Sequence, residues 1–282
     1  MTKILVRKQL AEIFRTYFYD AKKNKARSKG AVIAYFILFA FIMVGLLGGM
    51  FTFVSILLRG TIASGYGWFY YLMLALVAIC LGAFGSVFNT FSGLYLSRDN
   101  DLLLSMPIPV RSIMVSRLLT VFLMGLMYSG CVSIPAAIVY LATAGFSLGA
   151  LVGAVMFVAL IAVFVLVLSC LLGYGVARLS LKLKNKSFMT VIFALLFIAI
   201  YYFAYFKAGS FVSEIVANIA LYGESLHAAA PLVFGIGRAF EGDLLSLLLV
   251  TLAVAALLAL TWYVLSRSFL KIATATGKTD RK

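Results

Sequence analysis

The acidic pair Asp99 and Asp101 is the arrangement in this sequence closest to a catalytic site. Two carboxylates one residue apart can ligate a magnesium ion that carries a diphosphate, as a prenyl- or phospho-transferring enzyme would need. Such enzymes need a second acidic cluster for a paired ion, whereas the other acids expected on that side are single: Glu12, Asp20 and Asp280. A membrane-embedded lipid-modifying enzyme is therefore one alternative function.

The remaining reactive side chains form no catalytic set. The one histidine, His227, has no His-Glu-x-x-His motif around it, and no Gly-x-Ser-x-Gly motif occurs. Gly277-Lys278-Thr279 imitates the end of a phosphate-binding loop, but that loop requires glycine where this chain has Ile272. The cysteines lie in apolar runs without metal-ligand or disulfide spacing: Cys80, Cys131 and Cys170. We therefore predict no enzyme activity and no cofactor or metal in this chain.

The composition places these residues in a membrane protein. Of the 282 residues, 64% are hydrophobic and 12% are charged, against about 45–50% and ~25% in soluble domains. The apolar stretches are continuous rather than alternating, which excludes a membrane β-barrel as well as a soluble or disordered chain. A net charge of +15 would suggest nucleic acid in a soluble protein, but here loop topology explains the basic residues better.

Five windows without charged residues define the predicted spans. A helix needs ~20 apolar residues to cross the ~30 Å hydrocarbon core. The longest window, 118–177, has 60 residues and holds two spans joined by a small-residue turn at 142–147. We predict an all-α integral membrane protein with six transmembrane helices, near 31–57, 66–95, 113–141, 148–176, 188–206 and 244–266.

The basic residues give these spans a direction. With both termini in the cytoplasm, 21 of the 24 lysines and arginines lie inside, and only Arg59, Lys207 and Arg238 lie outside. Cytoplasmic loops concentrate lysine and arginine. We therefore predict that the amino-terminal arm 1–30 and the tail 267–282 are both cytoplasmic.

The amino-terminal arm is predicted to form an amphipathic interfacial helix followed by a basic linker. Apolar residues recur at helical spacing from Val6 to Tyr17, while Arg7, Lys8 and Arg15 lie towards the other side. Such a helix lies in the membrane plane with its apolar stripe in the acyl boundary. The basic linker would then meet anionic lipid headgroups.

The cytoplasmic loop 97–112 is predicted to contain a short helix. Asp99 or Asn100 can cap this helix, and Pro107 ends it. Three consecutive leucines in a loop that faces the cytosol favour a partner surface. The candidate docking residues are Asp99, Asn100, Asp101, Leu102, Leu103, Leu104, Ser105 and Met106.

The outer segment 208–243 is too polar to span the membrane and too apolar for a free loop. We expect two short helices, one that begins near Ser210 and is stopped by Gly223, and a second opened by Pro231. They would form a re-entrant hairpin, which the bilayer tolerates only where protein covers it or a cavity adjoins it. Its candidate gate residues are Glu214, Glu224 and Pro231.

The spans carry packing signals but no coupling residues. No charged residue or histidine lies near the middle of a predicted span, which argues against a proton-driven carrier and leaves a nucleotide-independent carrier as a second alternative. The glycine repeats 45–49 and 145–153 would let helices approach closely, as at a dimer seam. Pro135 is a candidate kink in the third span.

The whole layout resembles the permeases of ATP-binding-cassette (ABC) exporters, in the type-2, polysaccharide and drug exporter-like family. The most specific stretch runs from Asp99 to Pro109 and continues from Arg111 to Leu119. It resembles that family's signature of an acidic residue, Leu-Leu-x-Ser-x-Pro-Ile, and then Arg or Lys with Leu entering the third span. Many members hold two six-span halves in one chain, so this chain resembles a half-length relative.

The resemblance implies a role for each segment. The chain would be the membrane-spanning permease subunit of an ATP-driven exporter in the plasma (inner) membrane of a bacterium. Residues 1–30 would hold the connecting helix, 97–112 the coupling helix that docks on ABC ATPase subunits, and 208–243 the outer gate. ATP and magnesium would bind to the partner ATPase. The chain would pair as a homodimer or with a second six-span half, among membrane lipids and without nucleic acid.

Overall fold

A computed structural model describes residues 2–20, 25–90, 108–180 and 217–279, with six further positions between 195 and 214. The described chain is helical, apart from a two-stranded antiparallel ladder of β1 (Tyr19–Asp20) and β2 (Lys25–Ala26). Within these residues, five helices are long and apolar enough to cross a membrane: Lys29–Ala63, Gly67–Val87, Val110–Ala144, Leu148–Val176 and Leu244–Arg267. The chain is therefore an all-helical membrane protein with several candidate spans.

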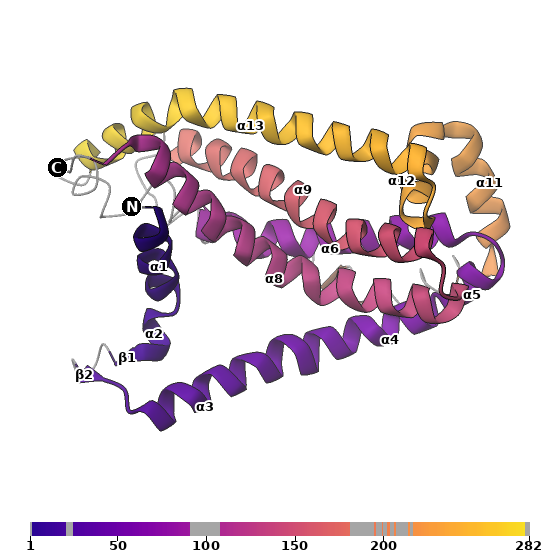
Figure 1. The fold of residues 1–282 in the computed structure, drawn as a ribbon, viewed down its shortest axis with the longest axis horizontal. Helices are drawn as coiled ribbons and strands as arrows, with labels where there is room; N and C mark the ends of the chain where they lie inside the picture. The colour runs from indigo at the N-terminus through magenta and orange to yellow at the C-terminus, as the bar shows by residue number, and fades with distance from the viewer. Residues whose placement is uncertain are drawn as a thin grey trace.

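Four long helices form the body of the molecule (Figure 1). They are α6 (Gly67–Thr90), α8 (Val110–Ala144), α9 (Leu148–Ser180) and α13 (Leu244–Thr279). Helices α6, α8 and α9 pack against one another, and α13 packs on α9. The predicted turn between α8 and α9 is present: Gly145 has a positive φ of 87°, and the Ala150 N–H donates to Ser147 Oγ over 3.1 Å.

The first span is one long helical run that diverges from this body. It comprises α3 (Lys29–Ala40), a π-helical segment η1 (Phe41–Gly48) and α4 (Gly49–Leu57), followed by α5 (Arg59–Ala63). Helix α4 packs on α8, whereas α3 lies apart from the bundle (Figure 1). Only 6% of its most apolar window is buried, against 50% for α6, α8 and α9.

The two ends of the molecule differ in structure. At one end, here the α1 end, α1 (Thr2–Ile13) runs across the bundle beside the start of α8, and α2 (Arg15–Phe18) leads towards α3 (Figure 1). Leu5 of α1 is buried against Ile113 of α8. At the other end, here the hairpin end, α11 (Ile219–Ala229) and α12 (Pro231–Glu241) lie beside the start of α13.

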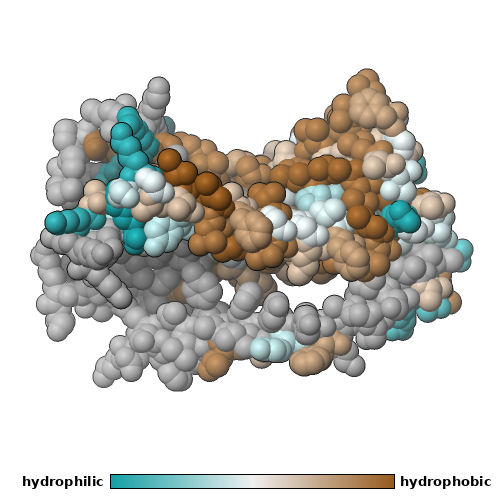
Figure 2. Space-filling model, turned by 90° about the horizontal axis from the view of Figure 1, so that it is seen from below, coloured by the Kyte–Doolittle hydropathy of each residue, from teal (hydrophilic) through white to brown (hydrophobic). Residues whose placement is uncertain are grey.

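The described basic residues gather at the α1 end. Arg59 and Arg238 belong to the hairpin end. Figure 2 shows teal, hydrophilic surface near both ends of the molecule and a brown, hydrophobic band between them. The basic residues on elements at the α1 end include Arg7, Lys8, Lys25, Arg27, Lys29, Arg111, Arg117 and Arg267.

The structure departs from the expected element boundaries in two places. Helix α13 continues through the predicted tail to Thr279, because no proline and no glycine before Gly277 interrupts it. Arg117, near the start of the predicted span 113–141, is 2% exposed inside α8. The predicted span 188–206 lies largely outside the described residues, and the described residues contain five candidate spans.

The second difference concerns the hairpin. Gly223 was expected to stop the first short helix, but α11 runs through it and ends at Ala229. A Cβ at Gly223 would lie 2.7 Å from the Tyr66 ring, so this glycine serves close packing and does not terminate the helix. Pro231 opens α12 as expected, since its fixed φ suits the first helical position.

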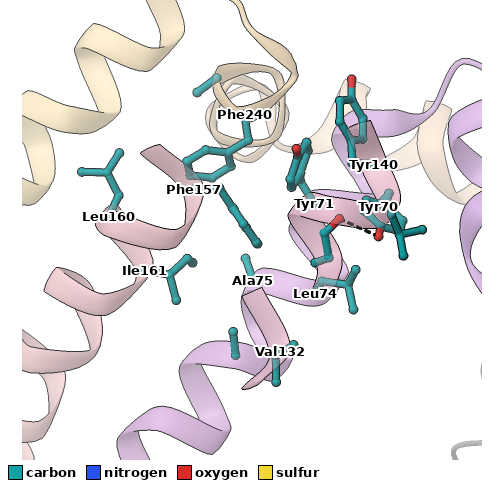
Figure 3. Close-up of a cluster of buried hydrophobic side chains, with 14 of the residues drawn as sticks. Tyr70, Tyr71, Leu74, Ala75, Val132, Tyr140, Phe157, Leu160, Ile161 and Phe240 are labelled. Carbon is teal, nitrogen blue, oxygen red and sulfur yellow. Dashed lines mark hydrogen bonds between the residues drawn. The ribbon is translucent and has the colours of Figure 1, made fainter. Parts of the chain in front are cut away.

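Aromatic rings fill the core where α6, α8, α9 and α12 meet (Figure 3). The Tyr71 ring centroid lies 4.5 Å from that of Tyr140 and 4.8 Å from that of Phe157, and Phe157 lies 5.0 Å from Phe240. The Tyr70 hydroxyl donates to the Ala136 carbonyl over 3.0 Å. These contacts fix the hairpin end of the bundle, because large rings bury much apolar surface in specific geometry.

Candidate functional site

A cavity of about 610 Å³ separates the first span from α8, and we call it the α3–α8 cavity. Its walls are almost entirely apolar. Phe39, Met43 and Gly49 contribute on the side of the first span, and Gly130, Cys131 and Pro135 on the side of α8. Its volume falls within the range of small-molecule binding sites, about 300–1,000 Å³.

Both walls of the α3–α8 cavity contain a helix irregularity. The wall of the first span is the π-helical segment η1, a geometry that is rare and enriched at functional sites. Pro135 interrupts α8 on the opposite wall, since a proline cannot donate to the carbonyl of Cys131 four residues earlier. The Cys131 thiol lies between two acceptors, the Met43 carbonyl across the gap at 3.3 Å and the Met127 carbonyl of its own helix at 3.2 Å, and it can donate to either. The two walls are therefore the parts of these helices most able to change their geometry.

An aromatic cluster lies next to the α3–α8 cavity on its α1 side. Phe14 and Tyr17 pack on Phe36, with ring centroids 5.6 and 5.5 Å apart, and Tyr17 lies 5.9 Å from Phe39. This cluster joins α1 and α2 to the free part of α3. The first span is thus held at both ends, while its middle faces the cavity.

Arg27 lies at the outer edge of this cluster. Its guanidinium lies 4.5 Å from the Tyr35 ring centroid, and Nη1 donates to the Tyr35 hydroxyl over 3.0 Å. Its Nε is buried and has no hydrogen-bond partner among the described residues. A positive group is therefore held at Tyr35, one helical turn before Phe39, the first residue of the cavity wall.

A second apolar cavity, of about 520 Å³, lies between α8, α9 and α13. Phe122, Cys170 and Trp262 are among its lining residues. It shares no residue with the α3–α8 cavity and contains no charged side chain. Two separate apolar cavities therefore flank α8.

Helix α12 packs between α9 and α6 at the hairpin end through backbone contacts. Gly153 and Gly149 of α9 lie directly against the carbonyl oxygen of Phe240 and the backbone of Gly242. On the other side, a Cβ at Gly237 would lie 2.5 Å from the Trp68 carbonyl oxygen. The 145–153 glycine repeat was expected at a dimer seam, but Gly149 and Gly153 instead seat α12 of the same chain.

Glu241 is the last residue of α12, and its side chain lies beside the start of α6. Its carboxylate accepts a hydrogen bond from the backbone N–H of Trp68, and its Oε1 occupies the space where Gly67 lacks a side chain. Burial raises the pKa of Glu241 above its ordinary value, while the Trp68 N–H and the nearby Arg238 act in the opposite direction. The carboxylate lies at the positive end of the α6 dipole, which favours its position.

The predicted site residues are spread rather than gathered. The docking residues Asp99 to Met106 lie outside the described residues. Glu214 is exposed and accepts from the Tyr222 hydroxyl over 3.0 Å, Glu224 is exposed on α11, and Pro231 is the exposed first residue of α12. No gate candidate lines either cavity described above.

Sequence reasoning missed the α3–α8 cavity and the packing of α12. A signal for the packing of α12 was present in the sequence, because both segments contain two glycines: 149 and 153 in one, 237 and 242 in the other. No protein-family model, curated protein or solved structure matches this chain. The function is therefore argued from the geometry described above and from the pattern of the sequence.

Proposed function

We propose that this chain is the membrane-spanning permease subunit of an ATP-driven ABC exporter. The observation that carries the proposal is where the connection between α6 and α8 leaves the bundle. Helix α6 ends at Thr90 and α8 begins at Val110, and both of these positions lie at the α1 end (Figure 1). The segment with the acidic and leucine-rich motif therefore leaves and re-enters the bundle beside α1 and the basic residues.

The charge distribution supports a cytoplasmic position for this end. Basic residues concentrate on the cytoplasmic side of membrane proteins, and the described ones gather at the α1 end. A motif such as Leu102 to Leu104 in that position is suited to dock on a cytosolic ATPase. The hairpin of α11 and α12 would then lie at the outer face and form the gate.

In this proposal the chain performs no chemistry. ATP binding to the partner subunits would shift the permease between two packings of its helices, which requires that the ATPase prefer one of them. The sparse packing of the first span and the irregularities at η1 and Pro135 support such a shift. The cargo would pass between this bundle and a second six-span half.

The test is to replace two of the three leucines and measure docking on the ATPase. The chain is co-expressed with a candidate ABC ATPase from the same genome, and Leu103→Ser/Leu104→Ser is compared with the unaltered chain. Burying one leucine is worth about 1.5–3 kcal/mol. Losing two contacts should therefore weaken co-purification and cargo-stimulated ATP hydrolysis by more than about tenfold.

The matched control is Phe146→Ser/Leu148→Ser. These two apolar side chains are 78% and 77% exposed in the turn at the opposite end of the molecule, so ATPase docking should be unchanged. Unchanged binding in the Leu103/Leu104 variant would contradict the proposal. Turnover of a lipid substrate by the purified chain alone, abolished by Asp99→Asn and Asp101→Asn, would favour the lipid-modifying enzyme instead.

A further inference from the structure

We propose that the α3–α8 cavity binds the acyl chain of an anionic phospholipid whose phosphate lies at Arg27. The proposal joins a charged group just before the first span, held over Tyr35, and an apolar cavity whose wall begins one turn further along at Phe39. It does not depend on the exporter function, because the site lies within a single chain.

The cavity has the chemistry and the length of an acyl-chain site. From Phe39 to Thr52 the wall extends over thirteen residues, or about 20 Å at the α-helical rise of 1.5 Å per residue. One leaflet of the bilayer supplies acyl chains across about 15 Å, half of the ~30 Å hydrocarbon core. A single chain would therefore run along η1 with the groove of α8 on its other side.

The charge at the entrance selects the headgroup. The Arg27 side chain is half-buried with its guanidinium over the Tyr35 ring, and Lys25 and Lys29 beside it are exposed. Asp20 lies opposite Lys25 in the backbone register of the β1–β2 ladder and is the one acidic residue of that ladder. Basic groups therefore outnumber acidic ones here, and a phosphate oxygen would give the Arg27 guanidinium a charge-assisted hydrogen bond.

The position of the first span favours a lipid over a protein partner at this site. The run from Lys29 to Ala63 has 6% of its apolar window buried, so the cavity wall is carried by a helix that faces the bilayer on its other sides. Exposed apolar side chains continue along it, with Ile37, Val44 and Leu46 at 64%, 73% and 57% exposure. A membrane lipid can thus enter the cavity sideways from the leaflet that α1 adjoins.

Lipid retention by the purified full-length chain tests the proposal. Native mass spectrometry in detergent, with added phosphatidylglycerol or phosphatidylcholine, should show one phosphatidylglycerol retained in preference. Gly49→Leu should abolish this retention, since the glycine lines the cavity and a Cβ there meets no atom within 4 Å. Gly60→Leu is the matched control, because that glycine of the same span is equally unhindered but lies outside the cavity.

A second variant tests the headgroup contact separately from the contact with the acyl chain. Arg27→Gln should reduce the preference for phosphatidylglycerol over phosphatidylcholine by about tenfold, the effect of losing one hydrogen bond to a charged group. Equal retention of the two lipids by the unaltered chain would overturn the choice of headgroup. Equal phosphatidylglycerol retention by the Gly49→Leu and Gly60→Leu variants would overturn the choice of cavity.

Thiol labelling gives a measurement that needs no glycine substitution. Cys131 lines the cavity, whereas Cys80 is exposed on α6 and outside it. Added phosphatidylglycerol should slow labelling of Cys131 by an apolar maleimide and leave Cys80 unchanged. Equal rates for Cys131 with and without lipid would overturn the proposal.

Discussion

The carbonyl oxygen of Phe240 lies against Gly153, so that α12 and α9 meet through their backbones at the hairpin end. No side chain separates the two helices at this point. The contact is repeated one turn away, where Gly149 lies 3.4 Å, measured from an ideal Cβ, from the Gly242 carbonyl oxygen. Helix α12 therefore belongs to the packed body of the protein, although it is too short to span the membrane.

Replacing Gly153 with alanine should loosen this contact. The added methyl group would collide with the Phe240 carbonyl, and overpacking of this kind costs about 1–3 kcal/mol. The expected result is a lower Tm in detergent. Gly175→Ala is the control on the same helix, because no atom lies within 4 Å of its Cβ position. That variant should be neutral or more stable, since alanine favours a helix by about 1 kcal/mol over glycine.

Replacing Glu241 with glutamine should change how stability depends on pH. Because burial raises the pKa of Glu241 above 4.5, the folded chain holds this proton more tightly than the unfolded chain. Its contribution to stability is present below pH 4.5 and is lost as the pH rises through the folded pKa. Glu241→Gln should therefore gain Tm relative to the unaltered chain as the pH rises from acid to neutral. A constant difference across that range would contradict this account.

Asp243 should behave with the opposite sign. The hydrogen bond from Ser246 Oγ, 2.6 Å from Oδ2, lowers the pKa of Asp243 below its ordinary value of 3.8. Its contribution to stability is present above pH 3.8 and is lost as the pH falls through the folded pKa. Asp243→Asn should therefore lower Tm at neutral pH and have little effect in acid. The two variants, two residues apart, control for each other in one pH series.

Replacing Pro135 with alanine should stabilise α8 and stiffen the cavity wall. Alanine restores the N–H that can donate to the Cys131 carbonyl, and an interior proline costs a helix about 3 kcal/mol. We expect a higher Tm and slower maleimide labelling of Cys131, which lies one turn away on the same wall. Cys170 in the other cavity should label at an unchanged rate. Faster Cys131 labelling would show that the proline holds the wall closed.

The two ends of the molecule should lie on opposite sides of the membrane. In a cysteine-free background, Glu224→Cys at the exposed surface of α11 should react with an impermeant maleimide in intact cells. Asn185→Cys, in the predicted cytoplasmic loop, should react only after the membrane is opened. Labelling of Asn185→Cys in intact cells would reverse the predicted topology.

The sequence is a good guide to where helices run, because charge and apolar length determine which segments enter the membrane. The turn at Gly145 and the start of α12 at Pro231 were predicted from local backbone preferences and are confirmed in the structure. These features depend on a few neighbouring residues only. They need no knowledge of what packs against them.

Features that depend on distant partners were wrong or missed. Gly223 is compatible with a helix stop, and only the nearby Tyr66 ring explains why it lies inside α11. Gly149 and Gly153 favour close approach, but the pattern does not name the helix that approaches. The π-helical η1 has an ordinary apolar sequence, Phe41 to Gly48, and no local residue preference marks it. The candidate cavity could therefore not be predicted, since both of its walls arise from tertiary arrangement.

The sparse packing of the first span implies that its sequence tolerates many substitutions. At Ile37, Val44 and Leu46 the surroundings demand only solubility in hydrocarbon, which many side chains satisfy equally well. At Tyr71 and Phe157, which are fully enclosed, volume and ring orientation are also specified. In a library that randomises each helix among apolar residues, positions along Lys29–Ala63 should thus accept many residue types. Positions along α6 and α9 should accept few. The long apolar helical run next to the amino terminus would then carry the least information about the fold.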